Sequence, residues 1–439
     1  MQTRPIYRKG YLPQKLILST LIASFLALPV NASARKEQIE FVEQQYQQLT
    51  QDQFSRNQVL YYMERGKLAF DGGDYQTAAQ MFDNAIADIE TVYSNNPEAE
   101  KARQLFNEEK VKPFKGETYE RAMVYYYRGL LDLIAHDYEN ARASFERGLL
   151  QDSMGRNRDF VQDFAALEYL SGWAAKCAGF KEQSQSSFVR AKQLNPILTP
   201  PTANKKTLII GESGIVPFKY YNTDLGGDLR YWPHPLDNIL YSQMKYGRSS
   251  LSSAEELYYQ ANMRGARIAD QIAYSKENIK QQAANFGEAS QNVASASIAV
   301  AQITSLIPGL NIISLGLIGI TSVGLATTAA VSEFSDAIGS GVDIRQWKSL
   351  PNRLYFATSS HPATKTTRYI SFVNQYGEKV DSEIEVLASK GKCQLVRANQ
   401  ATLSADQFAN WEVVQLKLSG RAYPIYGDEK YWQEVSYEK

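Results

Sequence analysis

Residues 66–85 read GKLAFDGGDYQTAAQMFDNA, and the same arrangement of small and aromatic residues returns at 129–148 (GLLDLIAHDYENARASFERG) and at 172–191 (GWAAKCAGFKEQSQSSFVRA). Each copy opens with a glycine, passes through a turn, and continues to a small residue followed four positions later by phenylalanine. Small residues let two helices cross closely, and the aromatic ring fills the space beside the crossing. The pattern predicts three helical hairpins stacked on their neighbours.

The pattern resembles the tetratricopeptide repeat, whose period is about 34 residues. Here both intervals are longer than that period, the first running from Gly66 to Gly129 and the second from Gly129 to Gly172. We therefore predict a domain of degenerate tetratricopeptide-like repeats over 35–198, with an insertion between Asn95 and Pro113 rather than a regular superhelix. The fold class predicted for the whole chain is mainly α with a smaller β part.

By resemblance to the repeat, a mostly apolar set of side chains is expected to face a concave inner surface. Three aromatic residues of this face, Tyr126, Tyr169 and Trp173, are the predicted partner-binding residues. Soluble proteins rarely leave such a surface open to water. Either a partner protein covers the face, or later residues of this chain fill it; both alternatives stay open, and plain core packing is the competing interpretation of each residue.

The segment 1–34 predicts a cleavable secretory signal peptide. It carries four basic residues and no acidic one, then an apolar run from Leu16 to Val30, and it ends in Ala32-Ser33-Ala34. A retained membrane anchor is the alternative, although the run is short for a span of about 20 residues. Without these four, the basic residues of the chain nearly match its acidic ones, a balance that gives no electrostatic reason to bind nucleic acid.

The chain has two cysteines, Cys177 and Cys393. Neither lies at the predicted cleavage site, so no residue there can carry a lipid. The first falls on a predicted core helix and the second on a predicted strand of another region. This separation favours two buried thiols over a disulfide bond, although an oxidising compartment permits pairing.

The second half predicts three further regions. The first, 199–250, is a strand and loop connector that includes a strand at Thr207–Ile210. The second, 251–346, combines a long helix from Ser252, where two capping-box spacings occur, with the uncharged segment Ala289–Ser332. That segment is either a helical pair buried in protein, which we favour, or a membrane insertion in which only Leu310–Val331 has the character of a span.

The third region, 347–439, predicts a small antiparallel β domain, sandwich-like, with an aromatic tail. Alternating apolar residues indicate strands at four places, separated by turn residues. The predicted strands are Arg353–Thr358, Thr367–Val373, Ser382–Ala388 and Lys392–Ala398.

Several motifs in shared order resemble an uncharacterised family of bacterial envelope proteins with tetratricopeptide-like repeats. The motifs are Glu64–Ala69 with Gly73–Tyr75, Phe114–Arg121 with Tyr125–Tyr127, Leu208–Lys219, and Val342–Trp347 with Leu350-Pro351. The resemblance implies a junction at Val342–Trp347 between a Gly-rich helical segment and a terminal β region. It implies no catalytic residue, and since this chain lacks a cysteine to acylate, lipid anchoring is not carried over.

We therefore predict a non-catalytic interaction scaffold of the cell envelope, periplasmic or associated with the outer membrane, whose partners are envelope proteins. The alternative is a membrane-inserting component that uses Leu310–Val331. The sequence shows no metal-ligand spacing, phosphate-binding loop or triad, so no catalytic residue, metal or cofactor is predicted. Ser213 lies between glycines after a strand, but it lacks the G-x-S-x-G frame and Pro217 follows where a nucleophile elbow needs a helix.

Overall fold

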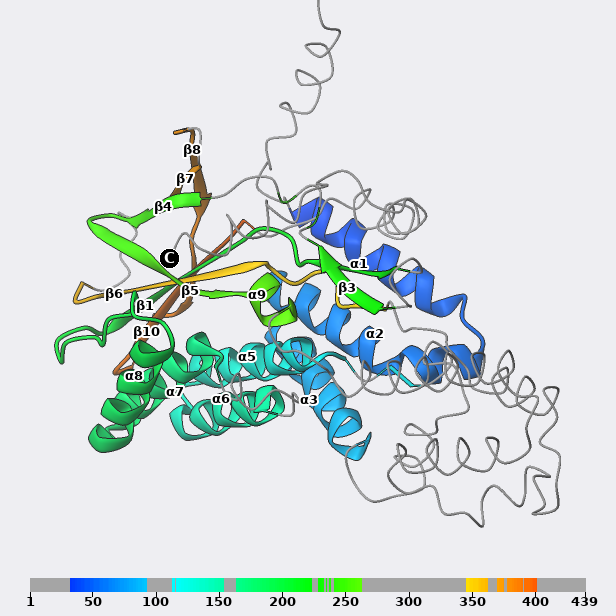
Figure 1. The fold of residues 1–439 in the computed structure, drawn as a ribbon, viewed down its shortest axis with the longest axis horizontal. Coiled ribbons are helices and arrows are strands. Elements are labelled where there is room, and N and C mark those ends of the chain that lie inside the picture. Colours follow the sequence, from blue (N-terminus) through cyan, green and yellow to red (C-terminus); the bar gives the residue numbers. More distant parts are fainter. Residues whose placement is uncertain are drawn as a thin grey trace, which may run out of the picture.

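The computed structural model of the 439-residue chain describes residues 32–92, 113–114, 116–153, 163–222, 228–232, 234, 237, 241–262, 345–361, 369–374, 377–389 and 391–400. Most of the predicted signal peptide, the uncharged segment Ala289–Ser332 with Leu310–Val331, and the aromatic tail lie outside these residues. The described part is a mixed α and β protein, as predicted, in which helices lie along one side of a curved sheet (Figure 1).

The helices follow one another as a lead-in helix and three hairpins. These are α1 (Ala32–Gln47), the pair α2 (Gln51–Asp71) and α3 (Tyr75–Val92), the pair α5 (Thr118–Ile134) and α6 (Tyr138–Ser153), and the pair α7 (Ala165–Ala178) and α8 (Lys181–Leu194). The turn inside each hairpin contains a residue with positive φ, namely Gly73 (79°), His136 (62°) and Gly179 (97°). Glycine adopts this backbone conformation without steric cost, so its placement at two of these turns ends the first helix of each pair there.

Each hairpin is closed by the same contact, in which a glycine of the first helix meets a phenylalanine of the second. A Cβ atom on Gly66 would lie 2.8 Å from the Phe82 ring, and one on Gly129 would lie 2.4 Å from the Phe145 ring. In the third hairpin the corresponding distance, from Gly172 to the ring of Phe188, is 3.1 Å. The absent side chain on the first helix is therefore what lets the ring of the second helix lie against its backbone.

Eight strands form one sheet in the order β8-β7-β4-β5-β6-β1-β10-β9. Their bounds are β1 Thr207–Ser213, β4 Tyr241–Tyr246, β5 Ser249–Glu256, β6 Arg353–Ser359, β7 Tyr369–Asn374, β8 Lys379–Glu383, β9 Glu385–Ala388 and β10 Gln394–Gln400. β1 pairs in parallel with β10, and the other pairings are antiparallel. A separate two-stranded sheet joins β2 (Phe218–Asn222) to β3 (Asp228–Trp232).

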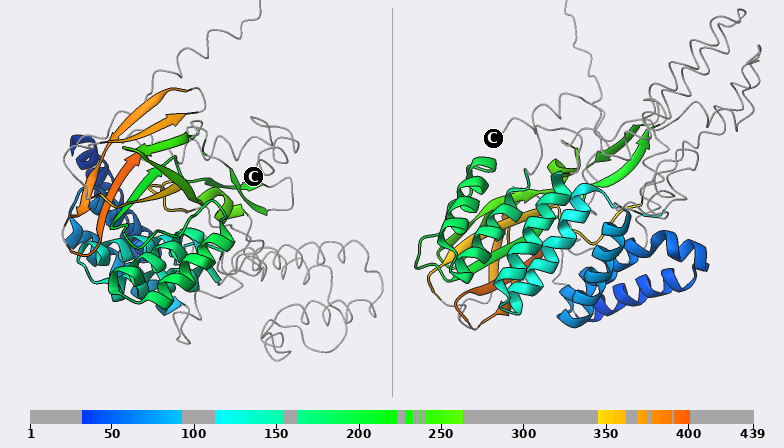
Figure 2. Two further views of the ribbon diagram at one scale, coloured as in Figure 1. Left: turned by 90° about the vertical axis from the view of Figure 1, so that its left-hand side faces the viewer. Right: turned by 90° about the horizontal axis from the view of Figure 1, so that it is seen from below.

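The eight-stranded sheet is barrel-like because its two ends are one continuous segment. β8 and β9 are separated only by Ile384, yet β8 pairs with β7 at one end of the strand order and β9 pairs with β10 at the other. Ser382 of β8 also donates from Oγ to the carbonyl oxygen of Asn399 on β10, at 3.4 Å. Figure 2 shows the resulting curvature of the sheet above the helices.

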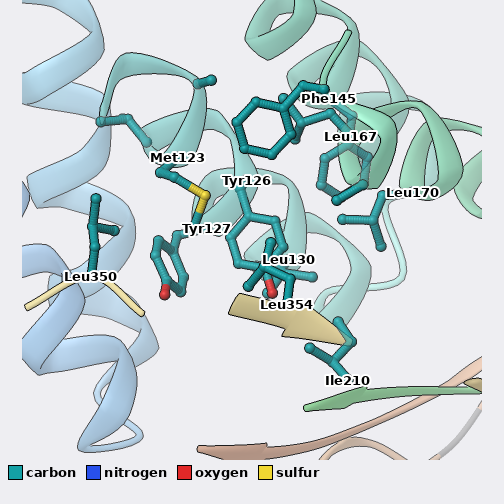
Figure 3. Close-up of a cluster of buried hydrophobic side chains, with 14 of the residues drawn as sticks. Met123, Tyr126, Tyr127, Leu130, Phe145, Leu167, Leu170, Ile210, Leu350 and Leu354 are labelled. Atoms are coloured by element: carbon teal, nitrogen blue, oxygen red, sulfur yellow. The ribbon is translucent and has the colours of Figure 1, made fainter. Parts of the chain in front are cut away.

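Two apolar cores follow from the alternation of side chains along the strands. On β1, Leu208 and Ile210 belong to the large core shared with the helices, whereas Ile209 belongs to a second core enclosed by the sheet. Figure 3 shows part of the large core, where Tyr126, Leu130 and other side chains of the helices meet Ile210 and Leu354 of the strands. The helical layer and the sheet therefore share one interior.

Two sequence predictions about this half of the chain are wrong. The start of the helix predicted from Ser252 lies instead in strand β5, which is followed by helix α9 (Leu257–Asn262), and the rest of that prediction lies outside the described residues. β5 is held between β4 and β6, and these pairings outweigh the local helix-capping pattern. The predicted sandwich confined to 347–439 is also wrong, because β1, β4 and β5 from earlier in the chain complete the barrel-like sheet.

The predicted strands of the C-terminal region are present with modest changes of boundary. β6 and β10 overlap the predicted Arg353–Thr358 and Lys392–Ala398, and β7 overlaps Thr367–Val373. The predicted strand Ser382–Ala388 spans parts of β8 and β9. The short strand predicted at Thr207–Ile210 is the first half of β1.

Candidate functional site

The three predicted partner-binding residues are all buried within the chain. Tyr126 lies on α5, and Tyr169 and Trp173 lie on α7, with exposed fractions of 0%, 3% and 1%. Tyr126 donates from Oη to Glu212 of β1 (3.1 Å), and the ring of Tyr169 lies 5.5 Å from that of Phe356 of β6. In this structure all three side chains belong to the large core, and strands of the same chain cover the inner face at Tyr126 and Tyr169, as the second alternative expected.

A buried ionic network joins the helical layer to the sheet beside Tyr126. Arg397 of β10 is fully buried, and its Nη2 lies 2.6 Å from both Asp71 of α2 and Glu212 of β1. Asp71 also accepts a hydrogen bond from the buried ammonium group of Lys67. The network ties the end of α2 to β1 and β10, the two strands that pair in parallel.

Charge complementarity keeps this network ionised. Burial alone would raise the pKa of Asp71, but Lys67 and Arg397 together hold that pKa below its usual value. Burial acts against the charge of Arg397, whose pKa is nevertheless raised by Glu212, Asp71 and Glu385. A buried ion pair adds little net stability over an apolar replacement, but it is costly to break by removing one partner. The network therefore fixes how the helices sit on the sheet.

A second polar contact joins helices α2 and α5 to the segment that precedes strand β6. We call residues Arg345–Leu350 the strap; they run without regular secondary structure along α2 and α5. The backbone N–H of Trp347 donates to Glu120 of α5 (2.6 Å), and that of Lys348 donates to Glu64 of α2 (2.5 Å). Two carboxylates on the inner side of neighbouring helices thus receive consecutive main-chain donors of a segment that forms neither helix nor strand and turns at Lys348 and Ser349.

Two side chains of the strap, Trp347 and Arg345, also contact the helices. The Trp347 indole is fully buried, with its ring 6.1 Å from that of Phe82 and 6.0 Å from that of Tyr127. Arg345 donates from Nη1 to the carbonyl oxygen of Arg56 (3.0 Å) and to Asn57 Oδ1 (3.1 Å). The strap therefore has a central aromatic anchor and a cationic anchor two positions before it.

Besides α2 and α5, the start of strand β2 also contacts the strap. Gln346 accepts from the backbone N–H of Lys219 (2.7 Å) and donates from Nε2 to the carbonyl oxygen of Pro217 (2.9 Å). Lys219 Nζ in turn donates to the carbonyl oxygen of Arg345 (2.7 Å). We call the surface formed by α2, α5 and the start of β2 the strap cleft.

Burial shifts the titration of the carboxylates that face the sheet and the strap. It raises the pKa of Glu64 to about 7, against the hydrogen bonds from Ser349 and Lys348. It also raises the pKa of Glu120, against the nearby charge of Lys219. Glu255 of β5 has its pKa raised to about 8, chiefly because it is buried and also because Asp163 and Asp152 lie near it.

Cys177 and Cys393 form a disulfide bond, with their Cα atoms 5.8 Å apart. The prediction of two separate buried thiols is therefore wrong. Its premise was that a helix of the repeats and a strand of the C-terminal region lie apart in space. Instead β10 pairs beside β1 under the helical layer, which brings the residue just before β10 against the end of α7.

The described residues offer little for catalysis or metal binding. Ser213 is the last residue of β1 and is fully buried, so no substrate reaches its hydroxyl group in this structure. Burial lowers the pKa of His234 to about 4, which leaves it neutral at physiological pH. No group of His, Cys, Asp or Glu arranged to hold a metal ion occurs among the residues that the structure describes.

Sequence reasoning did not find the strap cleft or the Arg397 network. The available signal was a charged residue on an otherwise apolar pattern: Glu64 and Glu120 on inner faces of helices, and Arg397 within an alternating strand. Fully buried charges need partners, but the partners lie far away in the sequence. Asp71, for example, precedes Arg397 by 326 residues.

Comparisons of the chain with models of protein families, with curated proteins and with solved structures find no match. Within the described ranges, no helix is both long and apolar enough to cross a membrane.

Proposed function

We propose that this chain is an exported scaffold protein of the bacterial cell envelope that acts by binding other chains rather than by catalysis. The observation that carries the proposal is that the helical hairpins hold the strap, a segment without helix or strand, through Glu120 and Glu64, which receive consecutive backbone N–H groups. Binding of extended segments on an inner face is a use to which stacked helical hairpins are suited.

Two features support location in the envelope. The segment 1–34 has the composition of a signal peptide. The Cys177–Cys393 disulfide belongs to an oxidising compartment, since disulfides are rare in the reducing cytosol. The degenerate tetratricopeptide-like character of the hairpins remains part of the proposal. Its support is the Gly–Phe contact that recurs in each hairpin.

The proposal is tested by crosslinking in intact cells that export a tagged chain. We expect discrete adducts of higher mass in the envelope fraction, and none from a matched chain that lacks the segment 1–34 and stays in the cytoplasm. The proposal fails if the exported chain forms no adducts with crosslinkers of several lengths, or if the full chain fractionates with the cytoplasm.

The second candidate is a membrane-inserting envelope component. It rests on the segment Ala289–Ser332, which contains no charged residue, and on Leu310–Val331 within it. Extraction of envelopes at alkaline pH separates the two functions. A scaffold without a membrane span is released into the supernatant, whereas an inserted chain stays with the lipid pellet.

A further inference from the structure

The strap cleft holds its occupant as a peptide-binding site holds a ligand. The strap's main chain makes contacts through the N–H groups of Trp347 and Lys348 and through the carbonyl oxygens of Arg345 and Leu350. Main-chain hydrogen bonds of this kind supply affinity for any extended segment, and the pockets for its side chains supply selectivity.

Selectivity comes from two anchors at fixed spacing. Trp347 is fully buried against the rings of Phe82 and Tyr127, and buried tryptophan and arginine residues are frequent hot spots of protein interfaces. Arg345, two positions earlier, lies with its guanidinium carbon 5.5 Å from the centre of the Phe114 ring while it donates to backbone and side-chain oxygens of α2. The cleft is therefore expected to select segments in which arginine and tryptophan are separated by one residue.

Two polar groups of the cleft, Glu120 and Lys219, also have partners outside the strap. Glu120 accepts a hydrogen bond from the backbone N–H of Glu117 (2.6 Å), which is part of the capping box at the start of α5. Glu117 in turn lies 3.1 Å from Lys219 Nζ. Because α5 and β2 hold Glu120 and Lys219 in place, this acceptor and this donor are positioned before a segment occupies the cleft.

The strap is also bounded by a separate anchor on its C-terminal side. Asn352 donates from its backbone to Ser213 (3.0 Å), accepts from the backbone of Leu257 (2.7 Å), and donates from Nδ2 to Asp237 (2.7 Å). These contacts fix the start of β6 to β1 and α9 without the strap. On its N-terminal side the strap follows the segment 263–344, which lies outside the described residues. Removal of the strap from its cleft therefore leaves the contacts of β6 in place.

We propose that the strap cleft is a recognition site for a peptide of a partner protein that carries arginine two positions before tryptophan and adopts the conformation of the strap, and that the strap is its intramolecular ligand. The inference rests on the proposed function and adds to it the site and the class of ligand. Partner binding requires the strap to be displaced, so the strap limits binding until a competing segment is present at sufficient concentration.

The test uses the full mature chain with Trp347→Ala, which empties the aromatic pocket, and a fluorescent peptide DIRQWKSL that copies residues 343–350. Fluorescence anisotropy is expected to show saturable binding to this variant at least tenfold tighter than to the unchanged chain, in which the strap competes. Peptides with alanine in place of arginine or of tryptophan are expected to bind at least tenfold more weakly. Peptides N-methylated at tryptophan or at lysine are also expected to bind at least tenfold more weakly, since they lack the N–H groups that donate to Glu120 and Glu64.

Circular dichroism establishes that the variant is folded. If Trp347→Ala does not fold, the double variant Arg345→Ala/Gln346→Ala loosens the strap while retaining its tryptophan. Absence of saturable peptide binding to whichever variant is folded overturns the inference, as does binding that is indifferent to the peptide's tryptophan or to N-methylation. Adducts in intact cells together with no peptide binding would leave the scaffold function standing and reject the strap cleft as its site.

Discussion

Replacing Glu64 with glutamine is expected to stabilise the protein at alkaline pH. Glu64 is 3% exposed on α2, and burial raises its pKa from 4.5 to about 7. The glutamine side chain keeps an oxygen that can accept the backbone N–H of Lys348, so the exchange removes the charge while it retains the contact with the strap. The prediction therefore isolates the cost of burying one ionised carboxylate.

The sign and the magnitude follow from linkage. A carboxyl group whose folded-state pKa lies above its unfolded value binds more protons in the folded state, so stability is present below the unfolded pKa and is lost as pH rises toward the folded pKa. A rise from 4.5 to about 7 corresponds to about 3 kcal/mol at 1.36 kcal/mol per pKa unit. We expect Glu64→Gln to be about 3 kcal/mol more stable than the unchanged chain at pH 8, and the difference to fall below about 1 kcal/mol at pH 5.

The assay is urea unfolding of both chains at pH 5 and pH 8, followed by tryptophan fluorescence, with the free energy of unfolding extrapolated to zero denaturant. The matched control is Glu383→Gln on β8, an exposed glutamate at which removing the charge should change stability little at either pH. A Glu64→Gln chain that is less stable than the parent at pH 8, or whose advantage is the same at both pH values, would refute the reasoning.

Three further changes test the packing and the ties between helices and sheet. Gly129→Ala should destabilise the fold by about 1–3 kcal/mol, because the added Cβ would lie 2.4 Å from the ring of Phe145. Gly172→Ala should destabilise it less, since its Cβ would lie 3.1 Å from the ring of Phe188. Equal denaturation midpoints of the two variants would contradict this expectation. Arg397→Leu removes the guanidinium that two buried carboxylates share, leaving Asp71 with Lys67 and Glu212 with tyrosine hydroxyl groups, and should cost about 3–5 kcal/mol. An unchanged urea midpoint would show that the network does not hold the layers together. The Cys177→Ser/Cys393→Ser chain should lose about 3–5 kcal/mol, since the disulfide joins residues separated by 216 positions; reduction of the parent chain should reproduce the loss, and coincident melting of oxidised and reduced protein would argue against it.

The helical hairpins could be predicted because their determinants are local. In the first copy, Gly66, the turn at Gly73 and the ring of Phe82 all lie within one short stretch of the chain, and the structure uses each as the pattern predicts. The strands of the C-terminal region were also visible as alternating residues. Both signals depend only on near neighbours in the chain, which sequence reasoning can inspect directly.

The features that could not be predicted depend on distant partners. Ser252–Glu256 carries helix-capping spacings, and only its pairing with β4 and β6 makes it a strand. The buried Tyr126 looks the same in the sequence whether a partner or β1 covers it. Because each outcome is decided by residues far away in the sequence, no local pattern distinguishes the alternatives.

The position of β1 in the sheet constrains how the protein is made. Every residue of this strand is buried, and its two neighbours are β6 and β10, which begin only at Arg353 and Gln394. Contacts between residues so far apart in the chain give a high contact order, which slows folding. A nascent chain therefore carries an unsatisfied apolar strand until Gln400 has emerged, and a C-terminal truncation before Gln394 would leave that strand permanently exposed on one side.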